Sequence, residues 1–258
     1  MESIIFSISK SVALIALNRP EKFNSFNREM ALNLQDVLDQ CNENDEVRVV
    51  YITGAGKAFS AGQDLAEIPD PEGPGMKRIL VEHYNPIIKK IRNCNKPVIA
   101  AVNGVAAGAG ANIALCCDIV VAANSASFIQ AFSKIGLVPD SSGTFFLPRL
   151  IGMQKASALM MLGDKVPAAE AEKLGMIYKT FPDEAFVDES MKLADSLASM
   201  PTRGLAYIKE ALNKSFSQTL EQQLVTEDKL QQKAADTSDF KEGVAAFLEK
   251  RPAIFSGK

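Results

Sequence analysis

The sequence predicts an α/β fold in which strands and helices alternate through the first half of the chain and helices follow alone after residue 167. Short apolar stretches, as expected for strands covered on both faces, alternate with stretches of helical periodicity. Strands are predicted at 12–17, 47–53, 97–102 and 119–123. Helices beyond residue 167 are predicted at 168–174, 184–200, 202–216 and 219–235.

The remaining elements follow from the spacing of apolar residues. Residues 1–10 alternate apolar and polar side chains through Ile4, Phe6 and Ile8, which predicts a strand rather than a signal peptide. The stretch 28–41 places an apolar stripe on one face of a helix. Further helices are predicted at 84–93 and 113–117.

Composition excludes several classes of protein. The 258 residues are 47% apolar and 23% charged, with a net charge of -3 spread along the chain, so no nucleic-acid surface is indicated. No apolar run approaches the roughly 20 residues of a membrane span. The cysteines form no CxxC pair and predict buried thiols in a reducing compartment, so we expect a cytoplasmic protein. They are Cys41, Cys94, Cys116 and Cys117.

Several common catalytic and cofactor-binding motifs are excluded, because individual residues do not match them. The stretch 54–57 lacks the earlier glycine and the Ser or Thr of a phosphate loop, and Gly108-Ala109-Gly110 does not continue as a dinucleotide fingerprint. The single histidine, His83, occurs without a GxSxG elbow, which argues against a serine hydrolase. One histidine and no cysteine cluster argue against zinc. We expect no metal and no separate cofactor.

Two segments after strands are composed of residues that could expose backbone amides. They are 58–65 and 103–112, and both are rich in small residues that let a ligand approach the main chain. A helix is predicted to start within or after each, so free N–H groups should point outward. Two such amides could form an oxyanion hole. Tight packing between helix and strand would explain the same glycines.

A third segment places Asp140 among Leu137, Val138 and Pro139, with two phenylalanines following. Apolar surroundings raise the pKa of a carboxyl group and suit it to proton transfer near neutral pH. Asp140-Ser141-Ser142 is equally good chemistry for capping a helix. The sequence alone leaves both interpretations open.

Together these segments resemble the crotonase family, also called the enoyl-CoA hydratase/isomerase family, along essentially the whole chain. The resemblance is carried by Leu17-Asn18-Arg19-Pro20, by 59–65, 103–110 and 136–140, and by Leu147-Pro148-Arg149. It implies a spiral of ββα turns over residues 1–200. It also implies a helical C-terminal region, 201–258, that forms a homotrimer or a dimer of trimers.

The resemblance further implies an acyl-CoA thioester substrate, with coenzyme A as part of the substrate. Asp140 would be the catalytic acid and base, and the N–H groups of Gln63 and Ala109 would form the oxyanion hole. Phe255 and Lys258 would reach coenzyme A in a neighbouring subunit. Other substrate contacts are expected from Lys22, Ala61, Gln63, Asp64, Leu65, Gly108, Asn112 and Phe132.

Two positions that differ from the family pattern limit which of the family's reactions we expect. Hydratases of the family use two glutamates to handle water, and Asn112 and Phe132 stand at those positions here. Asp140 matches the carboxylate of the family's isomerases. The expected activity is therefore a double-bond shift through one base, with hydration, thioester hydrolysis or a non-catalytic acyl-CoA-binding role as alternatives.

A closer likeness joins the chain to one isomerase subgroup of the family. It is carried by 83–86, 104–111, 131–134, 240–243, Phe247 and 255–258, whereas Ser141-Ser142 replaces a glycine-rich stretch common in that subgroup. The Pro- and Gly-rich segment 67–75 is interpreted either as a lid or as an inert surface loop.

Overall fold

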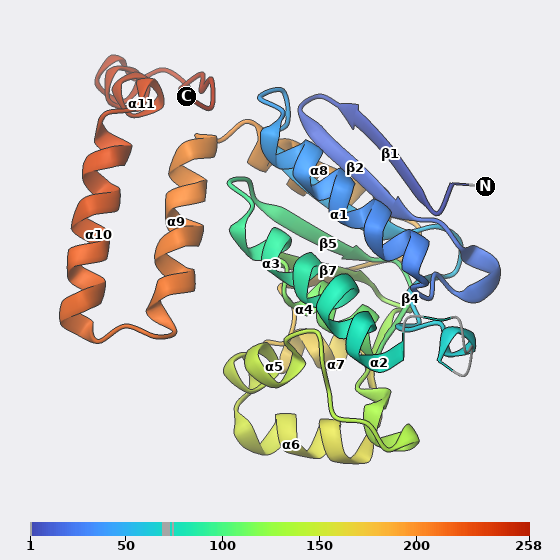
Figure 1. Ribbon diagram of the computed structural model, residues 1–258. Helices are drawn as coiled ribbons and strands as arrows, with labels where there is room; N and C mark the ends of the chain where they lie inside the picture. Colours follow the sequence, from blue (N-terminus) through green and yellow to red (C-terminus); the bar gives the residue numbers. More distant parts are fainter. Residues whose placement is uncertain (1, 69–72, 74) are drawn as a thin grey trace.

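The chain forms two sheets wrapped by helices, with a helical lobe at the C-terminus, as the computed structural model shows (Figure 1). The structure describes residues 2–68, 73 and 75–258. The predicted segment 67–75 falls largely outside them, at 69–72 and 74, so its lid interpretation stays a prediction. Within the described residues, none of the helices combines the length and the apolar composition that crossing a membrane requires.

The larger sheet has six strands in the order β1-β2-β3-β5-β7-β10. All neighbours run parallel except β1 and β2, which are antiparallel. The strands are β1 (Ile4–Ser9), β2 (Val12–Leu17), β3 (Val49–Gly54), β5 (Val98–Val102), β7 (Ile119–Ala123) and β10 (Lys179–Phe181). The first five confirm the strands predicted from the sequence.

A second sheet has the order β4-β6-β8-β9, with β8 and β9 antiparallel. Its strands are β4 (Ala58–Ser60), β6 (Val105–Ala107), β8 (Ser127–Ile129) and β9 (Lys165–Pro167). Each of β3, β5 and β7 is followed at once by the strand that joins the second sheet. The chain therefore winds as a ββα spiral, which confirms the predicted fold class.

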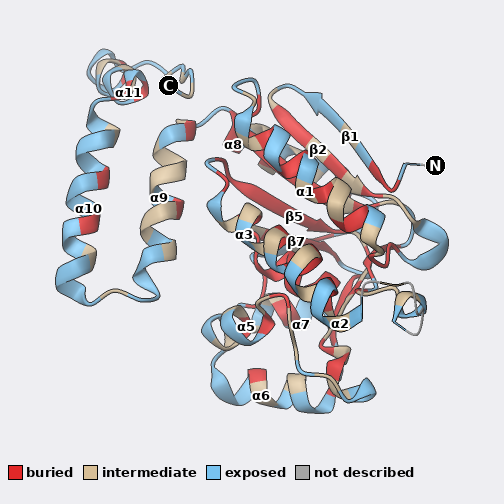
Figure 2. Cartoon of the chain, viewed as in Figure 1, coloured by how far each residue is buried: buried red, intermediate tan, exposed pale blue. Residues whose placement is uncertain are grey.

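Helices cover the larger sheet on both faces. Helices α1 (Arg28–Glu43) and α3 (Asn85–Asn93) pack on one face, and α8 (Phe186–Ala198) contacts β2, β3, β7 and β10 (Figure 1). Burial of the central strands follows from this arrangement, and Figure 2 shows them as the most continuous buried part of the molecule. All four cysteines are buried and free.

Helix α1 shows how local chemistry sets the ends of an element. Asn27 begins it by accepting a hydrogen bond from the N–H of Met30 (3.0 Å), and its buried face carries the predicted apolar stripe. At its other end, the buried Lys96 ammonium donates to the carbonyls of Cys41 and Asn42 (2.7 and 2.8 Å). A cation there complements the negative end of the helix dipole.

Two elements near the site differ from the sequence prediction. Helix α4 (Ala109–Leu115) begins four residues before the predicted 113, because Gly108 adopts a positive φ of 53° and turns the chain into the helix. A six-residue π-helix, η3 (Ile79–Tyr84), precedes α3 and was not predicted. The short 3-10 helices are η1 (Pro20–Lys22), η2 (Leu65–Glu67) and η4 (Ala131–Ile135).

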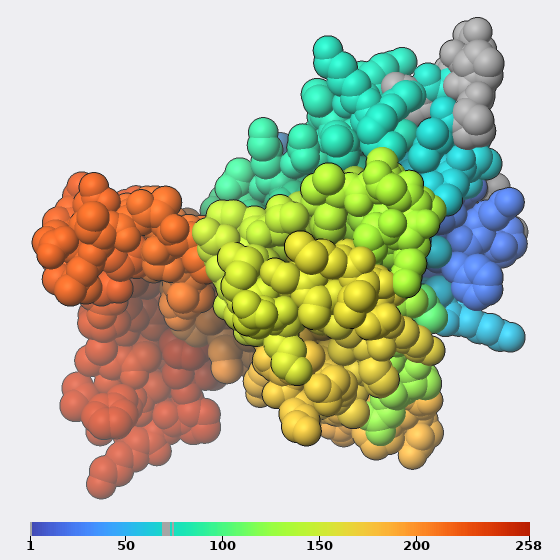
Figure 3. Space-filling view, turned by 90° about the horizontal axis from the view of Figure 1, so that it is seen from below, coloured from blue at the N-terminus to red at the C-terminus, as the bar shows by residue number. Residues whose placement is uncertain are grey.

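The remaining helices lie mostly in the second half of the chain. Of these, α7, α9 and α10 confirm predicted helices, whereas α2, α5, α6 and α11 were not predicted. Their bounds are α2 (Gly75–Arg78), α5 (Gly143–Ile151), α6 (Met153–Leu162), α7 (Ala168–Lys173), α9 (Thr202–Ser215), α10 (Leu220–Ala235) and α11 (Ser238–Glu249). The last three form a lobe beside the core, orange to red in Figure 3.

A buried ion pair anchors this lobe to the core. The Lys209 ammonium on α9 donates to the Asp118 carboxylate at 2.7 Å and to the carbonyl of Ile91 at 2.7 Å, and only 6% of its side chain is exposed. Asp118 also binds the Arg92 guanidinium at 3.0 Å. These contacts fix α9 against the end of α3 and the start of β7.

Asp118→Asn should therefore destabilise the fold, because it leaves the buried Lys209 charge without its partner. We expect the free energy of unfolding to fall by about 3 kcal/mol in urea denaturation. The control Glu210→Gln breaks an exposed pair with Lys214 and should cost under about 1 kcal/mol. Equal losses in the two variants would contradict the anchoring role.

Candidate active site

A cavity of about 200 Å³ lies between the segments 61–65, 108–109 and 131–140. We call it the Asp140 cavity. Of the residues predicted to form the site, Ala61, Gln63, Leu65, Gly108, Ala109, Phe132 and Asp140 line it. The other lining residues are Ile68, Met76, Ile79, Tyr84, Ala131, Lys134, Ile135 and Leu137.

The two amide-presenting segments touch directly, and glycine is required at the contact. Gly62 has a φ of +88°, and a Cβ there would lie 2.8 Å from the carbonyl oxygen of Ala107 and 3.2 Å from the nitrogen of Ala109. A Cβ on Gly110 would lie 2.6 Å from the carbonyl oxygen of Ser60. Close packing therefore explains these glycines, and it places both segments beside one cavity. Their predicted role in an oxyanion hole stays a prediction.

Main-chain pairing leaves the N–H of Gln63 free. Phe26 forms an isolated parallel bridge with Gln63, in which the Phe26 N–H donates to Gly62 (2.7 Å) and the Asp64 N–H donates to Phe26 (2.8 Å). In a parallel bridge of this kind, the main-chain N–H and C=O of Gln63 itself point away from Phe26. Ala109 is the first residue of α4, so its N–H has no partner within the helix. Among the described residues, the main-chain pairing thus leaves the N–H groups of Gln63 and Ala109 unused, and both residues line the cavity.

Asp140 is half-buried, and its carboxylate faces this cavity. Its Oδ1 accepts a hydrogen bond from the Ser141 hydroxyl at 2.8 Å. Burial raises the pKa of Asp140 above that of an ordinary aspartate, and the Ser141 hydrogen bond opposes part of that rise. Asp140 does not cap α5, because that helix begins at Gly143 with Ser142 as its N-cap residue, and the N-cap makes no side-chain capping hydrogen bond.

Asn112 is buried and is not among the residues that line the cavity, so its predicted substrate contact stays a prediction. It is 1% exposed, its Nδ2 donates to the carbonyl oxygen of Asp140 (2.8 Å), and its Oδ1 accepts from Gln130 (2.8 Å). Gly143 packs so close that a Cβ there would meet the Asn112 amide at 2.3 Å. Asn112 therefore holds the main chain that carries Asp140.

Lys22 and Asp64 also lie outside the lining of the cavity. Asp64 pairs with Arg19 at 2.8 Å and accepts from the N–H of Ala66. Its burial acts to raise its pKa, but these hydrogen bonds and the charges of Arg19 and Lys22 outweigh it, so the pKa is lowered. Lys22 is exposed on η1, which leaves its ammonium accessible to an anion.

Several lining residues were not predicted from the sequence. Tyr84 and Ile79 come from the π-helix η3, Met76 comes from α2, and Leu137 follows η4. Ser141, although next to the predicted Asp140, was not assigned a contact with it. No sequence signal marks a π-helix, so the direction of Tyr84 could be found only from coordinates.

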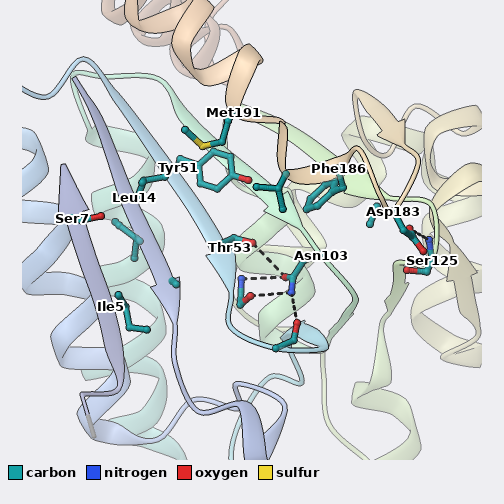
Figure 4. Close-up of a pocket in the computed structure, with 16 residues that line it drawn as sticks. Ile5, Ser7, Leu14, Tyr51, Thr53, Asn103, Ser125, Asp183, Phe186 and Met191 are labelled. Atoms are coloured by element: carbon teal, nitrogen blue, oxygen red, sulfur yellow. Dashed lines mark hydrogen bonds between the residues drawn. The ribbon is translucent and has the colours of Figure 1, made fainter. Parts of the chain in front are cut away.

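A larger groove of about 690 Å³ lies on the face of the six-stranded sheet beside α8 (Figure 4). It is mainly apolar, with Leu14, Tyr51, Phe186 and Met191 among its walls. Two of its polar side chains are engaged within the protein, since Asp183 accepts from the N–H of Ser125 (2.9 Å) and Asn103 donates to the carbonyl oxygen of Gly54 (2.9 Å). Size alone therefore does not make this groove the candidate active site.

The described ranges, 2–68, 73 and 75–258, contain no group of three His, Cys, Asp or Glu side chains that could hold a metal ion. The residues that line the Asp140 cavity supply one carboxylate with a raised pKa, the main chain of Gln63 and Ala109, and the polar side chains of Tyr84 and Lys134.

Comparisons with known proteins agree with this arrangement. The family model described as enoyl-CoA hydratase/isomerase matches residues 7–258. The chain belongs to this family. It is 46% identical over 261 residues to 1,2-epoxyphenylacetyl-CoA isomerase of Escherichia coli K12, covering 100% of both chains. It is 43% identical over 256 residues to a Rhodobacter capsulatus protein named "Probable enoyl-CoA hydratase", covering 99% and 98%.

The fold comparison supports the same family. An enoyl-CoA hydratase from Bacillus anthracis superposes with a TM-score of 0.92 at 32% identity, covering 99% of this chain and 100% of that one. The enoyl-CoA hydratase/isomerase family thus accounts for both the spiral and the full length of the chain. Its relatives include hydratases and isomerases, so the reaction of this member has to be argued from its own site.

Ser141→Gly should move the acid limb of the pH–rate profile to higher pH. The variant removes the hydroxyl that donates to Asp140, so the pKa of Asp140 rises further and the base is lost to protonation earlier as pH falls. Profiles of kcat/KM for acyl-CoA turnover measure this shift.

Ser142→Gly is the matched control. Both serines have positive φ angles, 49° and 64°, so both substitutions relieve the same backbone strain. The Ser142 hydroxyl donates to the carbonyl of Ser141 and not to the carboxylate. The acid limb should stay in place in this variant, and an equal shift in both variants would contradict the role of Ser141.

Proposed function

We propose that this protein is an acyl-CoA isomerase that shifts a double bond by one-base proton transfer through Asp140. The observation that carries the proposal is the composition of the Asp140 cavity. Among the described residues that line it, Asp140 has the single carboxylate, and it shares the cavity with Gln63 and Ala109, whose main-chain amides are outside the pairing described above. One base and one oxyanion hole are sufficient for proton transfer beside a thioester.

The reaction would start with the thioester oxygen between the N–H groups of Gln63 and Ala109. Asp140 removes a proton from carbon 2 of a 3-enoyl-CoA, and the electrons move onto the thioester oxygen to give a dienolate. The two amides stabilise that negative charge. The protonated Asp140 then returns the proton to carbon 4, which leaves the double bond between carbons 2 and 3.

Hydration is the second candidate, because the Rhodobacter relative is named as a hydratase. The positions at which hydratases of the family carry two glutamates hold Asn112 and Phe132. Phe132 contributes an apolar wall of the cavity, and the Asn112 amide is engaged by Asp140 and Gln130. Neither side chain can take a proton from water, so these positions favour isomerisation.

For the acyl group we propose the ring epoxide of phenylacetyl-CoA, 2-(1,2-epoxy-1,2-dihydrophenyl)acetyl-CoA, which is converted to the oxepin thioester. The support is the likeness to the 1,2-epoxyphenylacetyl-CoA isomerase of Escherichia coli over the full length. The mainly apolar lining, with Phe132, Leu137 and Ile79, suits an aromatic or aliphatic acyl chain. Simple 3-enoyl-CoAs would react through the same proton shuttle.

Asp140→Asn should lower kcat for 3-enoyl-CoA isomerisation by about a hundred- to ten-thousandfold, because the amide cannot accept the proton. Acyl-CoA binding, measured by calorimetry, should persist, since the amide has nearly the same shape. Asp188→Asn, at an exposed position on α8, serves as the control and should keep wild-type activity. Full activity in Asp140→Asn would refute the mechanism.

The choice between isomerase and hydratase can be tested by product analysis. We expect conversion of 3-enoyl-CoA to 2-enoyl-CoA, and of epoxyphenylacetyl-CoA to the oxepin thioester. We expect little 3-hydroxyacyl-CoA from 2-enoyl-CoA. Chromatography of the thioesters measures all three, and rapid formation of the 3-hydroxy product would favour the hydratase.

We also propose that the chain assembles as a homotrimer or a dimer of trimers. The C-terminal lobe is largely exposed in Figure 2 and carries exposed apolar side chains along three helices. They include Ile208, Leu212, Leu220, Leu224, Phe247 and Leu248, which are 55–82% exposed. Such a surface on an isolated chain is typical of an interface between subunits.

Light scattering after size-exclusion chromatography should give about three or six times the 27.9 kDa of one chain. Leu224→Lys on α10 should lower that mass, because it places a charge on the apolar surface. A monomer in the wild-type protein at micromolar concentration would refute the proposal.

A further inference from the structure

The π-helix η3 places a tyrosine hydroxyl against the segment that carries the proposed oxyanion hole. Ile79 and Tyr84 both line the Asp140 cavity although they are five residues apart. In a regular α-helix such residues would point about 140° apart. The wider turns of the π-helix bring them to one side, and π-turns of this kind occur frequently at functional sites.

Helix α1 holds the π-helix in place. Gln35 donates from Nε2 to the carbonyl oxygens of Glu82 (2.9 Å) and His83 (3.3 Å). Arg28 binds the Glu82 carboxylate and lies 3.1 Å from Nε2 of the fully buried His83. Because these contacts involve the two residues just before Tyr84, they fix the position of Tyr84.

The hydroxyl of Tyr84 acts as a donor toward Gln63. Nε2 of Gln63 donates to the Glu67 carboxylate (3.0 Å), which can only accept. The amide oxygen of Gln63 therefore faces Tyr84, whose hydroxyl lies 2.8 Å from it and must supply the proton. Glu67 in turn accepts from the N–H of Arg28 at the start of α1 (2.9 Å).

A second contact reaches the same segment through the ring of Tyr84. That ring packs edge-on against Phe26, with 6.0 Å between the ring centroids. The main chain of Phe26 pairs with Gly62 and Asp64 on either side of Gln63. Tyr84 thus contacts this segment twice. Its hydroxyl binds the Gln63 side chain, and its ring packs against Phe26, which pairs with the main chain around Gln63.

We propose that Tyr84 is a positioning residue, which orients the backbone N–H of Gln63 toward the thioester oxygen by fixing the Gln63 side chain. This inference rests on the proposed oxyanion role of that N–H. Oxyanion-hole donors act through fixed geometry, so a small rotation of the segment 61–64 weakens the stabilisation of the dienolate. Tyr84 itself takes no proton in this scheme.

Tyr84→Phe is the direct test, because it keeps the ring against Phe26 and removes only the hydroxyl. We expect kcat to fall roughly three- to tenfold, the loss expected for one hydrogen bond, with KM nearly unchanged. The acid limb of the pH profile should stay in place, since it belongs to Asp140. Tyr178→Phe, at a residue 66% exposed, is the matched control and should match wild type.

A double-mutant cycle with Gln63→Met separates positioning from a general loss of structure. Tyr84→Phe and Gln63→Met remove the same hydrogen bond, so the double variant should be little slower than the slower single variant. Losses in kcat that simply multiply would overturn the proposal. A shift of the acid limb in Tyr84→Phe would also overturn it, because Tyr84 would then act on Asp140 directly.

Absorption spectroscopy of bound cinnamoyl-CoA measures the hydrogen bonding of the Gln63 N–H to the thioester oxygen, and it requires no turnover. Hydrogen bonds to the thioester oxygen polarise the conjugated system and move its absorption to longer wavelength. Wild-type protein and Asp140→Asn should both show this red shift, and Tyr84→Phe should show a smaller one. An equal shift in Tyr84→Phe and wild type would refute the positioning role, whereas the proposed acid/base function is tested by the activity of Asp140→Asn.

Discussion

The contact between the two glycine-containing segments is the constraint on which the site depends. Gly62 lies against Ala107 and Ala109, and Gly110 lies against Ser60, at separations that leave no room for a side chain. This contact joins strand β4 to strand β6 and the start of α4. It brings two main-chain N–H groups from distant parts of the sequence to one cavity, and it fixes them on the rigid part of the spiral.

Asp140 is held by different means on the opposite wall of the cavity. Its carbonyl is bound by Asn112 from α4, and its carboxylate accepts from Ser141. The position at which we expect a glutamate in a family hydratase is thus occupied by an amide that binds the main chain of the proposed base. A change from a group that activates water to a group that positions a carboxylate is consistent with the proposed move from hydration to isomerisation.

The two serines after Asp140, Ser141 and Ser142, have strained backbone conformations. Both adopt left-handed backbone angles, which disfavour residues other than glycine by about 1 kcal/mol each. A glycine-rich stretch, as in the related isomerases, would remove that strain. Ser141 offsets it through its hydrogen bond to the carboxylate, so the substitution affects the chemistry of the site as well as its backbone.

Much of the fold could be predicted from the sequence, because long apolar strands and amphipathic helices carry a clear periodicity. Strands β1, β2, β3, β5 and β7 of the larger sheet and helices such as α1 and α9 followed from it, whereas β10 (Lys179–Phe181) lies where only helices were predicted. Strands β4, β6 and β8 did not, since three residues are too few to show a period of two. The helix α4 was placed four residues late, because its start depends on the positive φ of Gly108.

The sequence by itself determined the family and the spiral, because the motifs that indicate them are short and occur in a characteristic order along the chain. It also predicted the carboxylate and the amide-bearing segments of the proposed site. Only the tertiary structure decided whether Asp140 caps a helix or faces a cavity. It also showed that Asn112 is buried and does not line that cavity, and that a π-helix turns Tyr84 toward Gln63. These outcomes depend on contacts between residues such as 63 and 84 or 112 and 140, which no local pattern records.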